Sequence, residues 1–304
     1  MSIRFGSESF TIMEWNINHR VGSSGEAMPE WVIDVINEKS ADIIILTECS
    51  QRVPNWLEIK KKLFSGKQYV VFESNNDQAG QNDVLIAVNK NKFKVIYSKT
   101  YYSGNINTPD YLEVKCKCIF NGPEFTIVGM RIHDRDVKRP KKMNAKEYKE
   151  YEKKLDERDS KRNQEFRCAL DNLSNEEVVI IAGDFNNYKR GCTRTFRQNW
   201  CMEVLDEICT EKGFRRYTPY GSSMFQEHKD NDGDAFAQDH FIIKGIDEER
   251  ISLLPYDRSF AGKDKTVYMY GNDFSIYNYE WREIEWAVPT PYPDHAILIA
   301  EITL

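Results

Sequence analysis

Residues 178–187 constrain the fold of this chain most, because a short apolar run stops abruptly there and polar side chains follow it. The run, VVIIAGDFNN, has the composition of a buried strand up to Gly183 and then presents Asp184, Asn186 and Asn187. Acids and amides are uncommon inside strands, and open α/β sheets bind their ligands at the carboxyl ends of strands. The run therefore predicts a strand that ends in a functional site.

Three further apolar segments, TIMEWNIN, ADIIILTE and FTIVGMRIHD, end in the same way. The polar residues at their ends are Asn16 and Asn18, Glu48, and His133 with Asp134. A single strand end of this kind is usually a turn or a helix cap, but the repetition favours a site. We expect the four strand ends to form one polar site at the edge of a sheet.

Hydrophobic periodicity predicts strands at both ends of the chain that alternate with helices, and mostly strands between them. The predicted strands lie near residues 10–17, 42–47, 69–73, 84–89, 93–100, 111–120, 125–132, 240–243, 266–270 and 295–303, with one more at the GDFNN motif. Three helices are predicted. The first begins near Pro29, the second runs from about Asn144 to near Leu173, and the third ends at Gly213. This order predicts an α/β fold in which two mixed, mainly antiparallel sheets pack together with helices outside. Site motifs come from both halves, so we expect residues 1–304 to form a single domain.

The composition, with 40% hydrophobic and 30% charged residues, is that of a globular protein and excludes a disordered one. No segment approaches the roughly 20 apolar residues of a membrane span, and the N-terminus lacks the basic and apolar regions of a signal peptide. We therefore expect a cytoplasmic protein without a membrane span. Seven cysteines at irregular spacing, without a CxxC pair, favour reduced thiols over a disulfide framework or a zinc site.

Basic charge is concentrated in residues 135–167, which hold thirteen Lys or Arg and eight Asp or Glu. Two interpretations are open: a solvated helix face with ion pairs, or a basic wall beside a site that handles phosphate. Arg194 and Arg197, just beyond GDFNN, either bind a phosphate chain or form a basic surface turn. The aromatic segment 256–292 either fills a core or stacks on bases.

Six motifs occur in a fixed order: WNIN, LTE, a strand ending in His133, GDFN, QDHFII and a C-terminal DH. Together they resemble the endonuclease/exonuclease/phosphatase superfamily, which includes pancreatic-type DNases, apurinic endonucleases, deadenylases, inositol polyphosphate 5-phosphatases and sphingomyelinases. The resemblance covers residues 13–302 and implies a four-layer α/β sandwich. It also implies metal-dependent hydrolysis of a phosphate ester.

The resemblance implies a role for each motif residue. By position, Glu48 resembles the principal ligand of Mg²⁺, with Asn18 and Asp294 nearby, and Mn²⁺ is an alternative ion. A hard cation with oxygen ligands suits this set, because phosphodiester hydrolysis needs a cation, a base for water and donors for the developing charge. Asn18 is an amide where the family frequently has an acid, so we expect it to weaken or relocate a metal contact.

The resemblance implies that Asn16 and Asn186 hold the phosphate and align the nucleophile, and that Asp184 orients or deprotonates the attacking water. His295, held in place by Asp239, resembles the catalytic histidine of the family. The resemblance also implies a catalytic His133, which matches the second histidine of the DNase and phosphatase branches, where it supports the phosphoryl oxygens or the leaving group. Apurinic endonucleases have Tyr there, so abasic-site repair is disfavoured. His240, beside Asp239, is expected to be structural. The C-terminal motif departs from the family at Pro293 and Ile297, which are not implied to touch the chemistry.

Three functions are compatible with these motifs. The first is a metal-dependent phosphodiesterase that acts on nucleic acid. The second is a hydrolase of small or lipid phosphates, either a phosphomonoesterase of the inositol phosphatase type or a sphingomyelinase-like lipase, although no apolar membrane-docking hairpin is evident. The third is a non-catalytic binding relative, which is disfavoured because every catalytic position keeps a competent residue.

Overall fold

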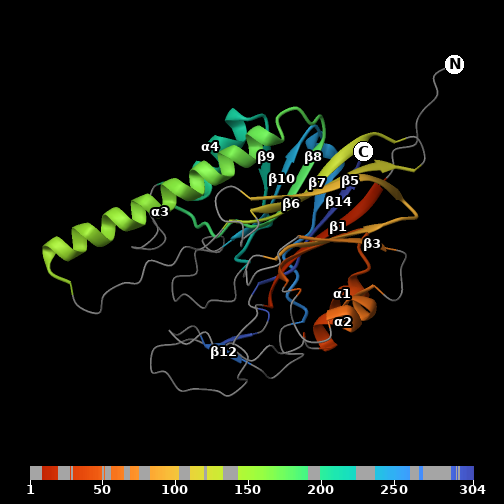
Figure 1. Ribbon diagram of the computed structural model, residues 1–304, viewed down its shortest axis with the longest axis horizontal. Coiled ribbons are helices and arrows are strands. Elements are labelled where there is room, and N and C mark those ends of the chain that lie inside the picture. The colour runs from red at the N-terminus through yellow and green to blue at the C-terminus, as the bar shows by residue number, and fades with distance from the viewer. Residues whose placement is uncertain are drawn as a thin grey trace.

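Two six-stranded sheets face each other in the computed structural model of the chain (Figure 1). The structure describes residues 9–19, 28, 30–49, 51, 56–64, 69–74, 83–102, 110–119, 122–132, 143–190, 199–223, 237–260, 267–269, 289–291, 293 and 295–304. Helices cover the outer face of each sheet, and the result is a four-layer α/β sandwich. The predicted fold class is therefore confirmed.

The first sheet has the strand order β11-β14-β1-β2-β4-β3. In that order the strands are β11 (Ile251–Leu253), β14 (Leu298–Thr303), β1 (Ser9–His19), β2 (Ile43–Cys49), β4 (Leu85–Asn89) and β3 (Tyr69–Glu73). Only β1 and β2 run parallel, and the other neighbours are antiparallel. The parallel pair places two of the predicted polar strand ends at one edge of the sheet.

The second sheet has the order β5-β6-β7-β8-β10-β9. Its strands are β5 (Phe93–Tyr101), β6 (Tyr111–Cys118), β7 (Glu124–Arg131), β8 (Val179–Asp184), β10 (Asp239–Lys244) and β9 (Arg215–Tyr217). Here β7 and β8 form the parallel pair. A short 3₁₀ helix, η1 (Glu248–Arg250), precedes β11, and β12 (Val267–Met269) pairs with β13 (Pro289–Pro291).

Helices α1 (Glu30–Lys39) and α2 (Trp56–Leu63) pack on the first sheet, and α3 (Ala145–Asn172) and α4 (Met202–Glu211) pack on the second (Figure 1). In α1 the apolar residues Val32, Val35 and Ile36 recur at helical spacing and are buried, as the sequence predicts. α2 was not predicted from the sequence. No helix among the described residues is long and apolar enough to cross a membrane.

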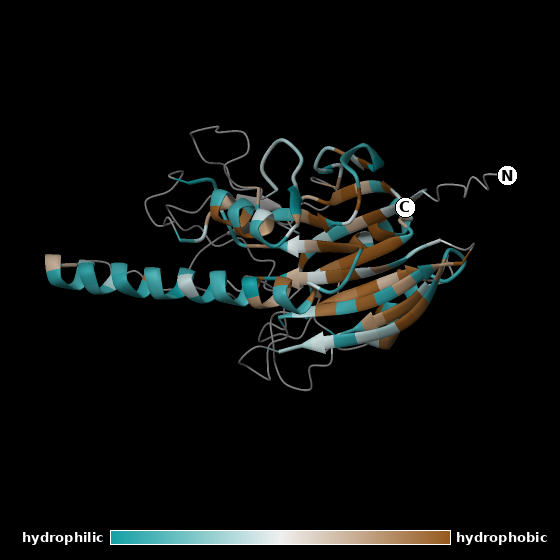
Figure 2. Ribbon diagram, turned by 90° about the horizontal axis from the view of Figure 1, so that it is seen from above, coloured by the Kyte–Doolittle hydropathy of each residue, from teal (hydrophilic) through white to brown (hydrophobic). Residues whose placement is uncertain are grey.

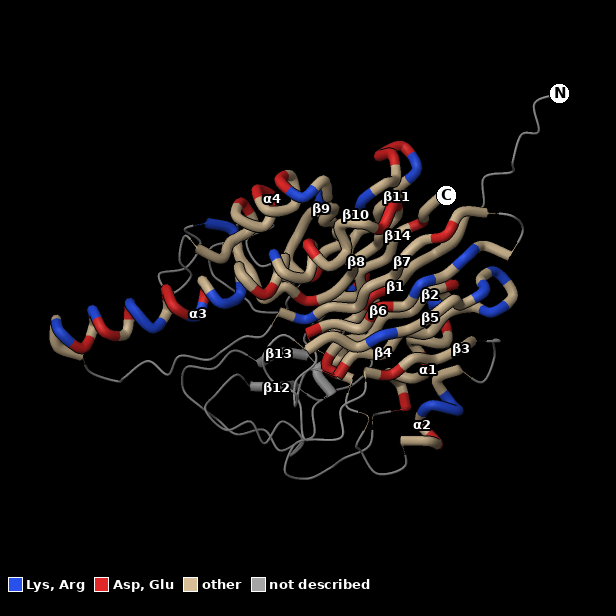
Figure 3. The backbone as a smooth tube through the Cα atoms, turned by 45° about the horizontal axis from the view of Figure 1, so that its top comes forward, with Lys and Arg blue, Asp and Glu red and all other residues tan. Residues whose placement is uncertain are grey.

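Helix α3 begins where the sequence predicts, because Asn144 caps its first turn. The Asn144 Oδ1 accepts from the backbone N–H of Glu147, and the Glu147 carboxylate accepts from the backbone N–H of Asn144. Its N-terminal half projects beyond the sheets and is hydrophilic (Figures 1 and 2). Charges of both signs alternate along it (Figure 3), so this half of α3 is a mixed surface and not a purely basic one.

Strand β1 shows how the sandwich positions the site. Alternate side chains of a strand point to opposite faces: Met13 and Trp15 pack under α1, whereas Phe10 and Ile12 enter the core between the sheets. The Phe10 ring lies 5.1 Å from the ring of Phe93 on the opposite sheet. By the same alternation, Asn16 faces the space between the sheets, where the ends of β2, β7 and β8 also lie.

Candidate active site

The end of β8 presents Asp184 to the space between the sheets. Gly183 permits the close packing that this requires, since a Cβ at Gly183 would lie 1.7 Å from the carbonyl oxygen of Met130 on β7. Three donors hold the Asp184 carboxylate: Nδ2 of Asn16 at 3.0 Å, Nδ2 of Asn186 at 2.8 Å and the backbone N–H of Asn186 at 2.8 Å. The predicted residues Asn16, Asp184 and Asn186 are therefore in direct contact.

Two of the predicted site residues have left-handed backbone conformations. Glu48 has φ 49° and Asn186 has φ 46°. Asparagine tolerates this region better than most residues, but a glutamate there is unusual. Such strain is frequently found at functional sites, where the surrounding structure holds a side chain in a required direction. In a regular strand the side chains of Thr47 and Glu48 would point to opposite faces. The left-handed backbone of Glu48, near the end of β2, changes the direction of its side chain from that alternation.

His295 and Asp239 form the predicted carboxylate–imidazole pair, with 2.7 Å between Nδ1 of His295 and Oδ2 of Asp239. Both side chains are buried. A carboxylate oxygen only accepts, so we assign the proton to Nδ1, which leaves Nε2 as the ring atom for proton exchange. The Trp15 indole N–H donates to the His295 carbonyl at 2.9 Å and fixes the backbone of that residue.

Asp184, Asp239 and His295 form one cluster, in which one ligand atom of each lies within 4.8 Å of the others. Burial raises the pKa of Asp184 to about 6; the charges of His295 and Arg131 oppose this rise and that of Asp239 adds to it. A carboxylate poised near neutral pH can accept a proton from water and release it again. The cluster thus has the chemistry of a general base beside an oriented histidine.

His240, the histidine of the second Asp-His pair, points away from this cluster. Its ring lies 2.9 Å from the Asn187 Oδ1 and 2.8 Å from the Thr218 Oγ1, and it packs beside Phe185 under the helices of the second sheet. Burial lowers the pKa of His240 well below its usual value, so the ring is neutral at physiological pH. These contacts suit the structural role expected for it.

Arg131, the last residue of β7, was not predicted as a site residue from the sequence. Its side chain is buried and forms ion pairs with Glu48, on the opposite sheet, and with Asp184, whose Oδ2 lies 3.4 Å from the Arg131 Nε. An arginine inside the apolar run FTIVGMRIHD was the signal that could have revealed it, because a charge there must find a partner.

Glu14, two residues before Asn16 on β1, was also missed. It is fully buried, and one oxygen accepts from the Thr47 hydroxyl at 3.0 Å, whereas Oε2 has no hydrogen-bond partner among the described residues. Burial, and next the charge of Asp239, raises the pKa of Glu14 well above its usual value. The folded protein therefore holds Glu14 as a neutral acid beneath the cluster.

Glu14→Gln should flatten the dependence of stability on pH. The unfolded chain ionises Glu14 near its ordinary pKa, whereas the folded chain keeps the proton, so wild-type stability is fully present below that pKa and is lost as pH rises toward the raised one. Above about pH 5 and below the raised pKa, the wild-type free energy of unfolding should fall with pH more steeply than that of the variant, by up to about 1.4 kcal/mol per pH unit. Urea denaturation in the presence of chelator measures both slopes, and parallel slopes would refute a neutral Glu14.

Several predicted residues lie outside the part of the chain that the structure describes. They are His133, Arg194, Arg197, Asp294 and the side chain of Asn18, together with residues 135–142 and most of the aromatic segment. Phe260, from that aromatic segment, is buried against Trp15 and therefore belongs to the core. The functions predicted for the other residues stay predictions.

The described donors suit a hard divalent cation. Glu48, Asp184 and Asp239 bring three buried carboxylates to one region, and Oδ1 of Asp239 is buried without a hydrogen-bond partner among the described residues. Mg²⁺ and Mn²⁺ prefer such oxygen ligands. Asp239 is engaged by Nδ1 of His295, and Asp184 accepts from three amide donors, so Glu48 is the one of the three that we expect to hold an ion.

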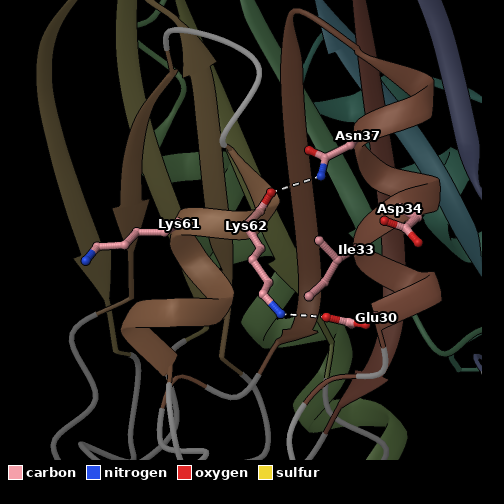
Figure 4. Close-up of a pocket in the computed structure, with 6 residues that line it drawn as sticks. All are labelled: Glu30, Ile33, Asp34, Asn37, Lys61 and Lys62. Carbon is pink, nitrogen blue, oxygen red and sulfur yellow. Dashed lines mark hydrogen bonds and ion pairs between the residues drawn. The ribbon is translucent and has the colours of Figure 1, made fainter.

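A surface pocket lies elsewhere, between α1 and α2, and its lining residues are shown in Figure 4. Two hydrogen bonds join the helices across it, from the Asn37 Nδ2 to the Lys62 carbonyl at 2.9 Å and from the Lys62 Nζ to Glu30 at 2.6 Å. None of the predicted site residues lines this pocket. It is a solvated junction between two helices on the outside of the first sheet.

Comparison with known proteins gives one family and several similar structures. The model of the Endonuclease/Exonuclease/phosphatase family matches residues 13–247, well over half of the chain. A family protein from Bacteroides thetaiotaomicron is similar in structure, with TM-score 0.58 and 14% identity over 98% of each chain. Truncated TDP2 from Caenorhabditis elegans gives TM-score 0.56 and 15% identity, over 97% of this chain and 98% of the other. A mannosyl-6-phosphatase from Bacteroides thetaiotaomicron gives TM-score 0.56 and 14% identity, over 97% of this chain and 99% of the other.

At these identities the structural similarity shows the fold alone. No curated protein matches the sequence. The three similar structures nevertheless share the fold over nearly their whole lengths, and the family match includes the segments that carry Asn16, Glu48, Asp184 and Asp239.

Proposed function

Because the chain belongs to the endonuclease/exonuclease/phosphatase family, we propose that it is a divalent-metal-dependent phosphodiesterase that hydrolyses nucleic acid. Proteins of this family are phosphoester hydrolases. The observation that carries the proposal is the buried cluster of Asp184, Asp239 and His295 at the strand ends. It contains the base and the oriented histidine that phosphoester hydrolysis requires.

Each residue of the cluster has a distinct role in the proposed reaction. Asp184 takes the proton of the attacking water as the water oxygen bonds to phosphorus; the bond from phosphorus to the leaving oxygen breaks, and that oxygen takes up a proton from solvent. Asp239 holds Nδ1–H of His295, so that the doubly protonated ring donates from Nε2–H to a phosphoryl oxygen. The amides of Asn16 and Asn186 keep the Asp184 carboxylate in one orientation, so the base does not need to reorganise during the reaction.

The metal ion is held, in this proposal, by Glu48 with Asp294 and Asn18. A bound Mg²⁺ or Mn²⁺ would neutralise phosphate charge and lower the pKa of a bound water. We further propose that the chain acts as one unit, because β1 and β2 of one sheet and β8 and β10 of the other all contribute to the site. The cytoplasm remains the proposed compartment.

A nucleic acid substrate is favoured over a small phosphate by the cations that follow the site in the sequence. Lys189 and Arg190 are exposed immediately after the buried segment that carries Asp184 and Asn186. Arg194 and Arg197 come next in the chain, and we propose that they bind substrate phosphates. Four cations beyond the scissile position would engage neighbouring phosphates of a polymer, which a single phosphorylated molecule lacks.

The dependence of activity on salt concentration distinguishes a polymer substrate from a small one. On a single-stranded oligonucleotide, log(kcat/KM) should fall with log[salt] with a slope of roughly −0.7 per phosphate contact, because each contact releases condensed counterions. A soluble inositol phosphate should be hydrolysed more slowly and with a much shallower salt dependence. Labelled DNA, RNA and inositol phosphate, assayed with Mg²⁺ and with Mn²⁺, provide the comparison.

The same series includes a matched variant. Replacing both Arg194 and Arg197 with Gln should reduce the salt slope on the oligonucleotide while leaving the rate on inositol phosphate close to that of the wild type. Faster hydrolysis of the inositol phosphate, or a flat salt response on the oligonucleotide, would instead indicate a phosphomonoesterase.

A further inference from the structure

Arg131 bridges the two sheets at the site. It ends β7 in the second sheet, is 4% exposed, and forms an ion pair with Glu48 at the end of β2 in the first sheet. Its second carboxylate partner, Asp184, lies beside it in the register of the parallel strands β7 and β8. The guanidinium therefore lies on Glu48, the carboxylate proposed to hold the metal ion, and on Asp184, the proposed base.

Gly129 explains why the guanidinium can reach the opposite sheet. It lies two residues before Arg131 and so faces the same side of β7. A Cβ at Gly129 would lie 2.5 Å from the side chain of Val84, which directly precedes β4 of the first sheet, and 3.0 Å from the side chain of Ile45 in β2. The sheets approach closely at this point because no side chain separates them, and the approach places Glu48 within reach of Arg131.

The ion pairs of Arg131 with Glu48 and Asp184 determine which contact a metal ion must displace. Glu48 is 1% exposed and Asp184 is 1% exposed, and carboxylates buried to that degree need a positive partner or a proton. Arg131 supplies that partner from the chain itself. A divalent cation that binds Glu48 needs the same carboxylate oxygens, which the guanidinium already contacts.

We propose that Arg131 is an internal counterion that competes with a divalent cation for Glu48. The inference rests on the metal part of the proposed function and adds to it a residue that limits the affinity for the metal. In the absence of metal, Arg131 holds Glu48 and Asp184 in their positions. When the ion binds, the guanidinium gives up Glu48, and part of the binding free energy of the ion is spent on breaking that ion pair.

Measuring Mn²⁺ affinity by isothermal titration calorimetry tests the competition without relying on activity. Arg131→Met should bind Mn²⁺ at least about tenfold more tightly than the wild type, because Glu48 is no longer paired and the repulsion between guanidinium and metal is removed. Lys115→Met is the matched control. It removes a partly buried cation paired with Glu176, opposite the start of β7 and away from the strand ends, and it should leave Mn²⁺ affinity unchanged.

A measurement on the wild-type protein covers the case in which Arg131→Met does not fold. The Nε–Hε resonance of Arg131, assigned by its absence from the spectrum of Arg131→Lys, should shift when Mg²⁺ is added, because the guanidinium leaves Glu48. An unchanged resonance at saturating Mg²⁺ overturns the competition. So does equal Mn²⁺ affinity of the wild type and Arg131→Met, which leaves the metal-dependent function intact. If neither protein binds a divalent ion, both the competition and the metal part of the proposed function fail.

Discussion

Replacing His295 with Ala should lower kcat on a phosphodiester substrate by at least about 100-fold, as expected for loss of an oriented donor to the charge that develops on the phosphate. Asp184→Asn should have an effect of the same order, because the amide cannot take a proton from water but keeps the shape of the carboxylate. Both residues belong to the cluster in which Asp239 holds His295 at 2.7 Å. Single-turnover assays at saturating metal would measure the loss in the chemical step.

His240→Gln is the control for these variants. His240 is a buried histidine next to Asp239 in the sequence, but its ring contacts Asn187 and Thr218 and not the cluster. The kcat of His240→Gln should stay within a few-fold of the wild-type value. Urea denaturation of every variant would show whether the fold is preserved. Near wild-type kcat in both His295→Ala and Asp184→Asn would reject the assignment of the site.

Gly183→Ala should destabilise the fold by about 3 kcal/mol or more, at the upper end of the range for overpacked positions. The added Cβ would lie 1.7 Å from the Met130 carbonyl oxygen, and this backbone atom cannot move without disturbing the pairing of β7 with β8. The same displacement would move Asp184, so activity should fall together with stability.

Gly213→Ala provides the comparison at the end of α4. Gly213 has φ 76°, and nothing lies within 4 Å of a Cβ built there. Its substitution should therefore cost only the strain of a left-handed alanine, about 1–2 kcal/mol. Equal urea midpoints for the two variants would show that the contact between Gly183 and Met130 does not limit the packing of the strands.

Most of the fold could be predicted from the sequence, because its long strands and helices carry strong local patterns. The predicted helix from about Asn144 to near Leu173 is observed as α3, whose start is set by the capping residues Asn144 and Glu147. Helix α2 was missed because it has only 8 residues, three of them consecutive lysines. So short a segment shows little more than two turns of helical periodicity.

Part of the site could be predicted for a different reason, namely that polar residues at strand ends stand out against apolar strands. Asn16, Asp184 and Asn186 are in contact, and His295 is paired with Asp239. These contacts agree with the positions that the family resemblance implied, whereas the catalytic roles of these residues remain predictions.

Arg131 and Glu14 could not be placed from the sequence because their environment depends on how the two sheets meet. Arg131 reaches Glu48 only because Gly129 lets the sheets approach each other. No local pattern in the sequence indicates which residues of two packed sheets face each other. Glu14 lies within an apolar strand. The alternation of side chains indicates which face of the sheet Glu14 is on, but not that this face is buried.

Turnover of one labelled oligonucleotide by the wild-type protein and by His295→Ala, each with Mg²⁺ and with excess chelator, tests the central claim most directly. The claim is that this site hydrolyses phosphodiester bonds with a divalent ion and with the chemistry of Asp184 and the Asp239–His295 pair. We expect rapid cleavage only by the wild type with Mg²⁺, and restoration of that cleavage when Mg²⁺ is returned after chelation. Full cleavage by the wild type in excess chelator, or cleavage by His295→Ala at the wild-type rate, would contradict it.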